Sequence, residues 1–482
     1  MASAIEHLPT LKQEISLRQL FALGFGSIIG VGWITVLGAW LAGAGAFGAA
    51  AAFLVGAVVV LLISFSYAEL ATRFPSTGGE IVYLHEIFGV TPAFAVGWLL
   101  AMGYSSIVVF EAISVGWIVS AIFPQLEGPV LYSIGGGDVT LGSLTAGIVG
   151  MIAIAWFNIR GAKTAARLQE IITLLLILLT IVFCTLSLLR GAPDNLLPHF
   201  VADGDGLIWT GMVALLVTVP FWFGGFDVIP QAMGEKSQSA SLKGVPLALG
   251  ASIVAAALFY VAIILAASYA LPREELLNSD LPVAEAMAAA LGSTTGGKIV
   301  LFAGLLGLIS TWNSLTYGAT RVLFALGRAR IIAPYFGELD ARRRTPVRAI
   351  LFVSAIGIAG SFFGRSAILP IVDAGAFAYV TTYAAVSLAA LVCLRGEQKR
   401  TTGAFTMPGG TATRALTAIL ASALAIFAFY QPYAASENSI PVEWMIFLVW
   451  IAAGLAFFLL SKRVRDETDR STRSALLARE GG

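Results

Sequence analysis

Three acidic residues lie within long apolar stretches of the sequence, where a charge needs a partner or a function. They are Glu111, Asp227 and Asp373. An acid at the centre of a membrane segment costs about 2.5–3.5 kcal/mol on insertion scales. A buried carboxyl group can hold a proton at neutral pH, or stay ionised beside a cation. The pattern therefore indicates proton transfer or cation binding.

Each acid also has a structural interpretation. Glu111, about midway along its apolar stretch, could be a protonated acid bonded to a neighbouring helix. Asp227 lies two residues after a glycine pair and could cap a helix or close a gate, and Asp373 could reach external water. We predict coupling or gating roles for Glu111 and Asp227.

Two glycine clusters interrupt apolar segments that would otherwise form continuous helices. Gly24, Gly26, Gly30 and Gly32 crowd the segment GFGSIIGVGW, and Pro220 precedes two glycines in PFWFGGFD. Non-helical backbone at membrane depth persists only where it lines a protein-buried or watered cavity. Its backbone groups then bind carboxylates, ammonium groups or cations. Close helix packing at a GxxxG pair is the alternative, but two clusters in related positions favour a binding site.

Composition places these features in a membrane protein. Of the 482 residues, 58% are hydrophobic and 12% are charged, and the formal net charge is +1. Soluble domains are about 45–50% apolar and about 25% charged, so these charges are too few for a water-exposed surface. A near-neutral chain has no global field for a nucleic acid. Three scattered histidines and two isolated cysteines predict neither a metal centre nor a disulfide framework.

A helix needs about 20 apolar residues to cross the hydrocarbon core. The sequence predicts twelve such spans and an all-α membrane fold. They cover residues 19–43, 47–72, 90–122, 141–158, 167–189, 207–234, 243–271, 297–327, 347–364, 366–394, 413–433 and 442–461.

Charge in the connections predicts the orientation. Even-numbered connections are basic, as at residues 160–167 and 342–348, whereas odd-numbered ones are acid-rich, as at residues 274–285. Lys and Arg remain on the cytoplasmic side, so residues 1–18 and the tail 462–482 are predicted to be cytoplasmic. At the inner helix ends, Glu69 and Glu235 are expected to form ion pairs with basic residues such as Arg73 and Arg328.

Four ordered segments resemble the amino acid–polyamine–organocation (APC) transporter superfamily. They are IIGVGWI in the first span, YAELATRFPSTGG followed by VYLHEIFG after the second, FWFGGFDVIPQAMGE in the sixth, and GATRVLFALGRARIIAPYF followed by RTP after the eighth. The resemblance implies a LeuT-type 5+5 inverted repeat with broken helices 1 and 6. It divides the chain into a first repeat at 19–190, a second at 206–394 and accessory helices at 413–461.

The resemblance also assigns candidate residues. The carboxylate-binding loop falls on Gly30, Val31 and Gly32, flanked by Ile29 and by the aromatic Trp33. The backbone that binds an ammonium group falls on Phe221, Trp222 and Gly224 of the sixth span. Phe223 and Phe226 would shape the cavity. Aromatic faces attract ammonium groups, although aromatics also pack membrane helices without any ligand.

Two departures from the family pattern bear on coupling. Many relatives have serine where this chain has Val31, so a hydroxyl donor to a substrate carboxylate is missing. Proton-coupled relatives often carry a lysine in the fifth helix, but residues 172–180 contain none. Ser310, Thr311 and Ser314 could instead form a cation site with carbonyls of the first break; their alternative is bonding to their own helix backbone.

These observations predict a secondary active permease for an amino acid or related amine, driven by a gradient and without a cofactor. Proton coupling is favoured; a sodium symporter or an exchanger of the same fold is the alternative. A non-transporting receptor or sensor would be expected to carry a sizeable soluble domain, and an intramembrane enzyme would need a catalytic constellation. The P-loop-like GSTTGGKI at 292–299 follows no strand and is a chance match.

Overall fold

The computed structural model describes residues 9–202, 207–393, 404–435 and 440–479. The first eight residues and the last three of the predicted cytoplasmic segments lie outside this range, as do residues 206 and 394 of the predicted second repeat and residues 436–439 of the predicted accessory segment. Within the described residues, ten helical segments are long and apolar enough to cross a membrane. The protein is therefore an integral, multi-pass membrane protein built almost entirely from helices.

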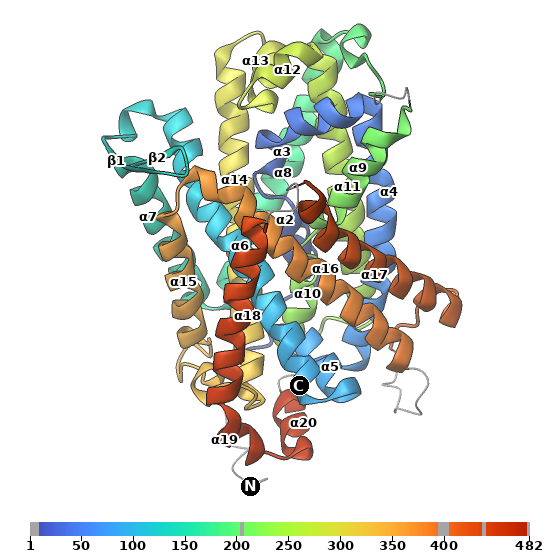
Figure 1. Ribbon diagram of the computed structural model, residues 1–482, viewed down its shortest axis with the longest axis vertical. Coiled ribbons are helices and arrows are strands. Elements are labelled where there is room, and N and C mark those ends of the chain that lie inside the picture. The colour runs from blue at the N-terminus through green and yellow to red at the C-terminus, as the bar shows by residue number, and fades with distance from the viewer. Residues whose placement is uncertain (1–8, 203–206, 394–403, 436–439, 480–482) are drawn as a thin grey trace.

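These ten segments contain the long helices of Figure 1. They are α2 (Leu17–Ile28) with α3 (Gly32–Thr35), α4 (Leu37–Arg73), α6 (Val90–Ile122), α7 (Leu141–Arg160), α8 (Ala162–Arg190), α11 (Gly244–Ala270), α14 (Thr294–Arg328), α16 (Ile368–Cys393), α17 (Gly410–Ala435) and α18 (Val442–Leu460).

Shorter elements complete the fold. They are α5 (Glu80–Phe88), α9 (Trp209–Trp222), α10 (Val228–Gln231), α12 (Arg273–Asn278), α13 (Pro282–Leu291), α15 (Val347–Ser361), α19 (Lys462–Asp466), α20 (Arg470–Ala478), the 3₁₀ turns η1 (Pro124–Leu126), η2 (Pro193–Leu196), η3 (Met233–Glu235), η4 (Pro334–Gly337) and η5 (Arg365–Ala367), and an antiparallel hairpin of β1 (Val130–Ile134) and β2 (Gly137–Thr140).

Helices occur at all the predicted spans, but one prediction needs correction. The span at 207–234 is interrupted, as expected for the sixth helix: α9 ends at Trp222, and a single turn, α10, follows. The connection predicted at 44–46 is a kink inside α4, at Gly45 with φ 74°. A Cβ at Gly45 would also stand 2.7 Å from the carbonyl oxygen of Pro198, which follows η2. The absence of a side chain therefore lets the kink approach this carbonyl.

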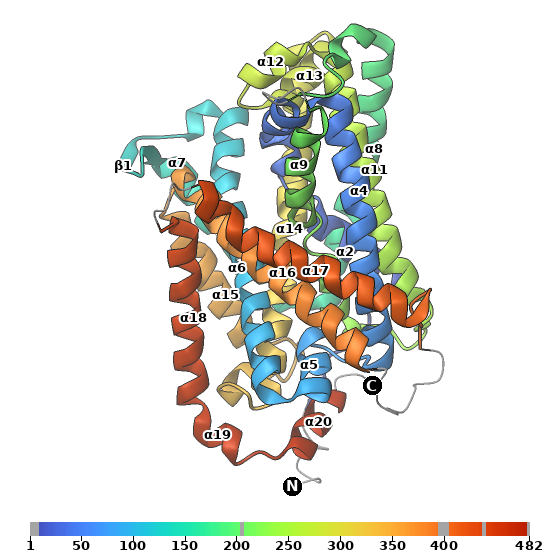
Figure 2. The ribbon, with the colours of Figure 1, turned by 45° about the vertical axis from the view of Figure 1, so that its right-hand side comes forward.

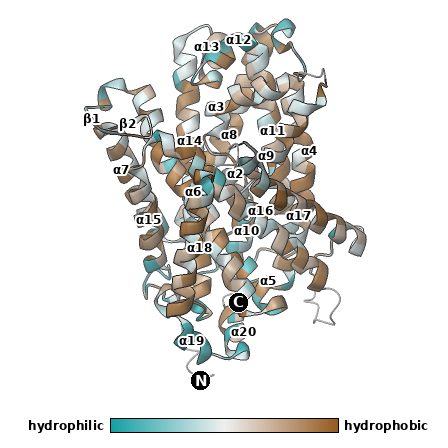
Figure 3. Ribbon diagram, viewed as in Figure 1, coloured by the Kyte–Doolittle hydropathy of each residue, from teal (hydrophilic) through white to brown (hydrophobic). Residues whose placement is uncertain are grey.

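Apolar residues run along most of the length of the long helices, and the buried ones pack against one another in a common core. Figure 3 shows hydrophobic residues throughout the long helices and more hydrophilic ones at α19 and α20. Outer helices leave large apolar side chains uncovered, such as Leu174 and Leu188 of α8 and Leu460 of α18. Exposed apolar surface of this extent is expected of lipid-facing helices. Figure 2 shows α17 running alongside α16.

The molecule has two distinct ends. The hairpin end carries β1–β2, η5, α12 and α13, and the opposite end, named here the α20 end, carries α5, α19 and α20 (Figure 1). The hairpin, α12 and α13 lie in connections for which the sequence predicts no element. The broken helices lie between these two ends and position the site described next.

Candidate functional site

The first helix break lies between α2 and α3. Ile29 leaves helical geometry at φ −91° and ψ 85°, and α3 resumes at Gly32. The amide of Gly30 donates to the carbonyl of Ile28 at 3.2 Å. The amides of Val31 and Gly32 donate to no backbone carbonyl among the described residues. This break therefore offers backbone donors to a bound group, as predicted for a carboxylate.

The second break, between α9 and α10, touches the first. Ser27 donates a hydrogen bond of 2.6 Å to the carbonyl of Gly225, joining the two interrupted helices. Gly225 has φ 110°, and a Cβ there would stand 2.8 Å from Ser27, so a side chain is excluded twice over. Tyr260 of α11 donates to the carbonyls of Ile28 and Trp222, both at 3.1 Å. Serine and tyrosine hydroxyls thus satisfy part of the unwound backbone.

A cavity of about 290 Å³ lies at these breaks. Its wall is mostly apolar, with a few polar groups, which is the usual composition of a small-molecule site. Six of the predicted binding residues line it: Gly30, Val31, Gly32, Phe221, Trp222 and Gly224. Glu111, Ser114, Thr311 and Tyr260 add polar groups, and Arg365 lies toward the hairpin end.

Glu111 of α6 is the acidic residue of this cavity. Its side chain is fully buried, and neither carboxyl oxygen has a hydrogen-bond partner in the described part of the chain. A methyl group at Gly30 would stand 2.7 Å from Oε1 of Glu111 and 3.2 Å from Oγ1 of Thr311. The carboxyl group thus lies directly against the first break, where it could bind an ammonium group or a proton.

The family model described as amino acid permease matches residues 15–458, which include both breaks and Glu111. The chain belongs to the amino acid permease family. This membership confirms the resemblance to the APC superfamily and makes the protein a membrane transporter.

Curated permeases match nearly the whole chain. It is 28% identical to the branched-chain amino acid permease BcaP of Bacillus subtilis, over 96% of this chain and 95% of that protein. It is 25% identical to the methylthioribose transporter of the same organism, over 96% of each chain. It is 26% identical to the amino-acid permease RocE, again from Bacillus subtilis, over 72% of each.

Four predicted binding residues of this permease lie outside the cavity lining. Ile29 is fully buried, and Trp33 packs edge-on against Phe259 at 5.3 Å. Phe223 lies against Tyr260, with ring centroids 5.8 Å apart. Phe226 packs edge-on against Tyr67 and at a tilt against Tyr383. These side chains contact neighbouring helices, so the cavity wall predicted for Phe223 and Phe226 is formed by other residues.

Asp227 also lies outside the cavity, just beyond the second break. Its carboxylate accepts hydrogen bonds from the hydroxyl of Tyr104 at 2.8 Å and from the amide of Gly225 at 3.0 Å. It therefore fixes the turn that carries Gly224 into the cavity wall. Asp373 is exposed on a separate cavity of about 380 Å³ between α4, α9, α16 and α17.

The candidate cation ligands of α14 bind the first break directly. Ser310 and Thr311 donate to the carbonyl of Gly26 at 2.9 and 3.0 Å. The side-chain amide of Gln169 donates to Ser310 and lies against Gly26. Ser314 is buried nearby. An amide donor therefore occupies the place where a cation would meet these oxygens.

Sequence reasoning missed Gln169 and Tyr260, although each left a signal. Gln169 is a polar residue just ahead of the lysine-free stretch 172–180, and Tyr260 is a phenol in an otherwise apolar span. Neither signal reveals that the side chain reaches the breaks, because that depends on how α8 and α11 are rotated.

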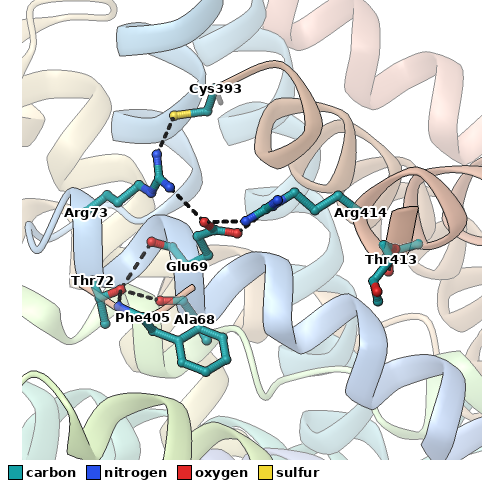
Figure 4. A network of polar contacts seen from close by, with 9 residues as sticks. Ala68, Glu69, Thr72, Arg73, Cys393, Phe405, Thr413 and Arg414 are labelled. Carbon is teal, nitrogen blue, oxygen red and sulfur yellow. Dashed lines mark hydrogen bonds and ion pairs between the residues drawn. The ribbon is translucent and has the colours of Figure 1, made fainter. Parts of the chain in front are cut away.

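Buried ion pairs hold the α20 end together. Arg414 of α17 binds both carboxylate oxygens of Glu69, at 2.8 and 2.9 Å, and Arg73 binds the same group at 2.8 Å (Figure 4). The pair predicted between Glu69 and Arg73 is thus confirmed, and Arg414 joins it.

Glu235 also forms an ion pair, but with a base other than the Arg328 suggested from the sequence. Arg321, a buried base of α14, binds both oxygens of Glu235 at 2.9 and 3.1 Å. Tyr317 donates to the same carboxylate. Arg328 instead donates to the carbonyls of Pro9 and Gly337, because it lies about two turns farther along the helix.

Proposed function

We propose that this permease is a secondary active transporter that moves an amino acid or related amine by alternating access. The solute would bind in the cavity between the two broken helices, and the bundle that carries them would expose it to each side in turn. The observation that carries the proposal is the buried carboxyl group of Glu111 against the unwound backbone at Gly30.

The substrate class follows from the groups that line the cavity. An ammonium group would pair with Glu111 and the face of Trp222. A carboxylate would accept hydrogen bonds from the amides of Val31 and Gly32. The names of the relatives agree with an amino acid, but the methylthioribose transporter is equally well covered. A solute without an amine therefore belongs in any substrate panel.

The wider architecture is part of the proposal. We assign twelve spans, adding the broken α9–α10 segment and the 15-residue α15 to the ten long segments. The first five and the next five would form an inverted repeat, with α17 and α18 accessory. The basic connections would place the α20 end in the cytoplasm, and the cavity beside Arg365 would then face outward.

We further propose that protons, rather than sodium, drive transport, with Glu111 or Asp227 as coupling groups. The N–H donor of Gln169 beside Ser310 and Gly26 would repel a cation from the predicted cation site. Replacement of sodium by choline in the assay buffer should therefore leave uptake unchanged, whereas sodium dependence would contradict this part of the proposal.

Proteoliposomes test the transport function. Counterflow of labelled amino acids, amines and methylthioribose should be saturable for at least one solute. Glu111→Gln should lower binding or accumulation of that solute about tenfold or more, while Glu275→Gln at the exposed surface should match the unmodified protein. Absence of counterflow for every solute, or an unaltered Glu111→Gln variant, would contradict the proposal. Unchanged pH dependence in both Glu111→Gln and Asp227→Asn would reject these coupling groups.

A further inference from the structure

Glu80, the first residue of α5, is a buried acid for which the central cavity gives no role. Its side chain is 0% exposed although α5 lies outside the long apolar segments. The preceding turn is pressed against α10, since a Cβ at Gly79 would stand 2.9 Å from Pro230 and 3.0 Å from Nε2 of Gln231. This contact directs the Glu80 carboxyl group inward, toward the second helix break.

The two oxygens of Glu80 have different surroundings. Oε2 accepts a hydrogen bond from the side-chain amide of Gln231. Oε1 has no partner in the described part of the chain. Asp227 lies close by, and both of its oxygens already accept hydrogen bonds from Tyr104 and Gly225. Oε1 of Glu80 is therefore the free position for a proton in this pair of acids.

Tyrosines surround the pair. The hydroxyl groups of Tyr67, Tyr83, Tyr379 and Tyr383 are buried and without a partner among the described residues. An unsatisfied buried polar group is costly, so such a cluster needs water or a proton to bridge it. Tyr67 packs edge-on against Tyr383, with ring centroids 6.1 Å apart, within this tyrosine cluster.

The basic side chains on the neighbouring elements are engaged elsewhere. On α4 and α20, Arg73, Arg470 and Arg473 bind Glu69 and the backbone carbonyls of Glu86 and Arg465. On α14, Arg321 binds Glu235, Arg328 binds the carbonyls of Pro9 and Gly337, and Lys298 lies in the first two turns, at the other end of the helix. His85 on α5 itself faces Glu86. Burial, and then the nearby charge of Asp227, raise the pKa of Glu80 well above its usual range.

We propose that Glu80 carries the transported proton on the α20 side of the permease. In the closed state seen here, the proton is bound at Oε1 of Glu80. When α5 and α10 separate, water reaches the tyrosine cluster, the O–H bond breaks, and the proton passes to that water. The carboxylate left behind is reprotonated from the cavity side by way of Asp227. This inference rests on the proposed transport function and adds Glu80, as the group that releases the proton, to the coupling groups proposed above.

Glu80→Gln separates coupling from transport, because it keeps the side-chain shape and a partner for Gln231. In proteoliposomes the variant should lose accumulation driven by a pH gradient, and the accompanying proton flux, by about tenfold or more. Counterflow of the same solute should remain within about twofold. Glu467→Gln, at the same end of the molecule and with a side chain that is 64% exposed, should leave all three measurements unchanged. Glu80→Asp should restore part of the proton flux.

Several outcomes would overturn the inference. Retained gradient-driven accumulation in Glu80→Gln would show that the proton is carried elsewhere. Loss of counterflow together with accumulation would show a structural role only, and a thermal-unfolding scan in detergent would confirm it. An unmodified protein that shows counterflow without proton flux would reject the proton role and leave the transport function standing. An unmodified protein without counterflow would reject the transport function itself.

Discussion

At the hairpin end, the central cavity adjoins a second cavity of about 450 Å³, and Trp117 and Arg365 line both. Arg365 approaches Asp280 at 3.7 Å, with side chains 52% and 84% exposed. At the α20 end, Glu69 and Glu235 are each bound by arginines of another helix, and the four acidic and basic partners at these interhelical contacts are at most 4% exposed. The two ends therefore differ in both packing and electrostatics.

In the alternating access proposed above, this difference would favour the state in which the α20 end is closed. An exposed ion pair contributes about 0–1 kcal/mol, so the contact at the hairpin end opens and closes at little cost. Removing one partner of a buried pair costs about 3–5 kcal/mol, because the remaining charge is left uncompensated. The α20 end is thus fixed by specific contacts, and opening it requires that these contacts be exchanged for water.

The largest expected loss of stability is at the α20 end. Arg321→Met would leave Glu235 buried without its base, and we expect destabilisation by about 3–5 kcal/mol. Thermal unfolding in detergent would measure it. Arg365→Met at the hairpin end is the matched control and should change the free energy of unfolding by about 1 kcal/mol or less. Equal effects of the two substitutions would contradict the contrast between the ends.

A second substitution tests the close contact between the cavity wall and Glu111. Gly30→Ala would place a methyl group 2.7 Å from the Glu111 carboxyl oxygen. The carboxyl group must then move, and we expect substrate affinity to fall about tenfold to a hundredfold, or about 1.4–2.8 kcal/mol. Gly43→Ala is the control, because a Cβ there meets no atom within 4 Å. Substrate-dependent thermal stabilisation would report both variants.

The features that the sequence could predict are those set by neighbouring residues. Features set by contacts between distant segments could not be predicted. The span predicted at 90–122 coincides with α6, and the breaks lie at the predicted glycines, because apolar runs and glycine clusters are local signals. Trp33 points away from the cavity and Gln169 reaches Ser310, and neither could be foreseen. Those contacts depend on helix rotation and packing, which no single segment encodes.

Arg321 shows the same limit from another side. It lies inside the predicted span 297–327 as a base in an apolar run, so its presence was visible in the sequence. Its partner was not, because Glu235 is 86 residues away along the chain. From the sequence, Glu235 was expected to pair with a base at the inner helix ends such as Arg328. In the fold, α14 instead brings Arg321 to Glu235 of η3.

A third prediction concerns the attachment of the accessory helix α17. Arg414→Met would remove one of the two bases on Glu69, but Arg73 would remain bound. We therefore expect a smaller loss than for Arg321→Met, about 1–3 kcal/mol. Thermal unfolding of Arg414→Met, Arg73→Met and the double variant would form a cycle. The double variant should be more damaging than either single change, whereas an effect of Arg414→Met as large as that of Arg321→Met would show that Arg73 does not compensate.

The smallest expected effect concerns α20, which docks on the end of α5. Ser474 donates to Glu86 at 2.6 Å, and Arg470 donates to the backbone carbonyl of Glu86. The hydrogen bond from His85 is the main cause that lowers the pKa of Glu86 below its ordinary 4.5, and Ser474 adds to it. Because folding lowers this pKa, the stabilisation is present above pH 4.5 and is lost as the pH falls through the lowered value.

Ser474→Ala should weaken the docking of α20 by about 0.5 kcal/mol, and acidification should weaken it further in the unmodified protein. Amide hydrogen exchange across residues 470–478, corrected for its intrinsic pH dependence, would measure both. Ser471→Ala on the exposed face of the same helix should leave the exchange unchanged. Docking of α20 that tightens as the pH is lowered would contradict the expected direction of the pH dependence. It would also contradict the view that Glu86 helps to hold the α20 end shut.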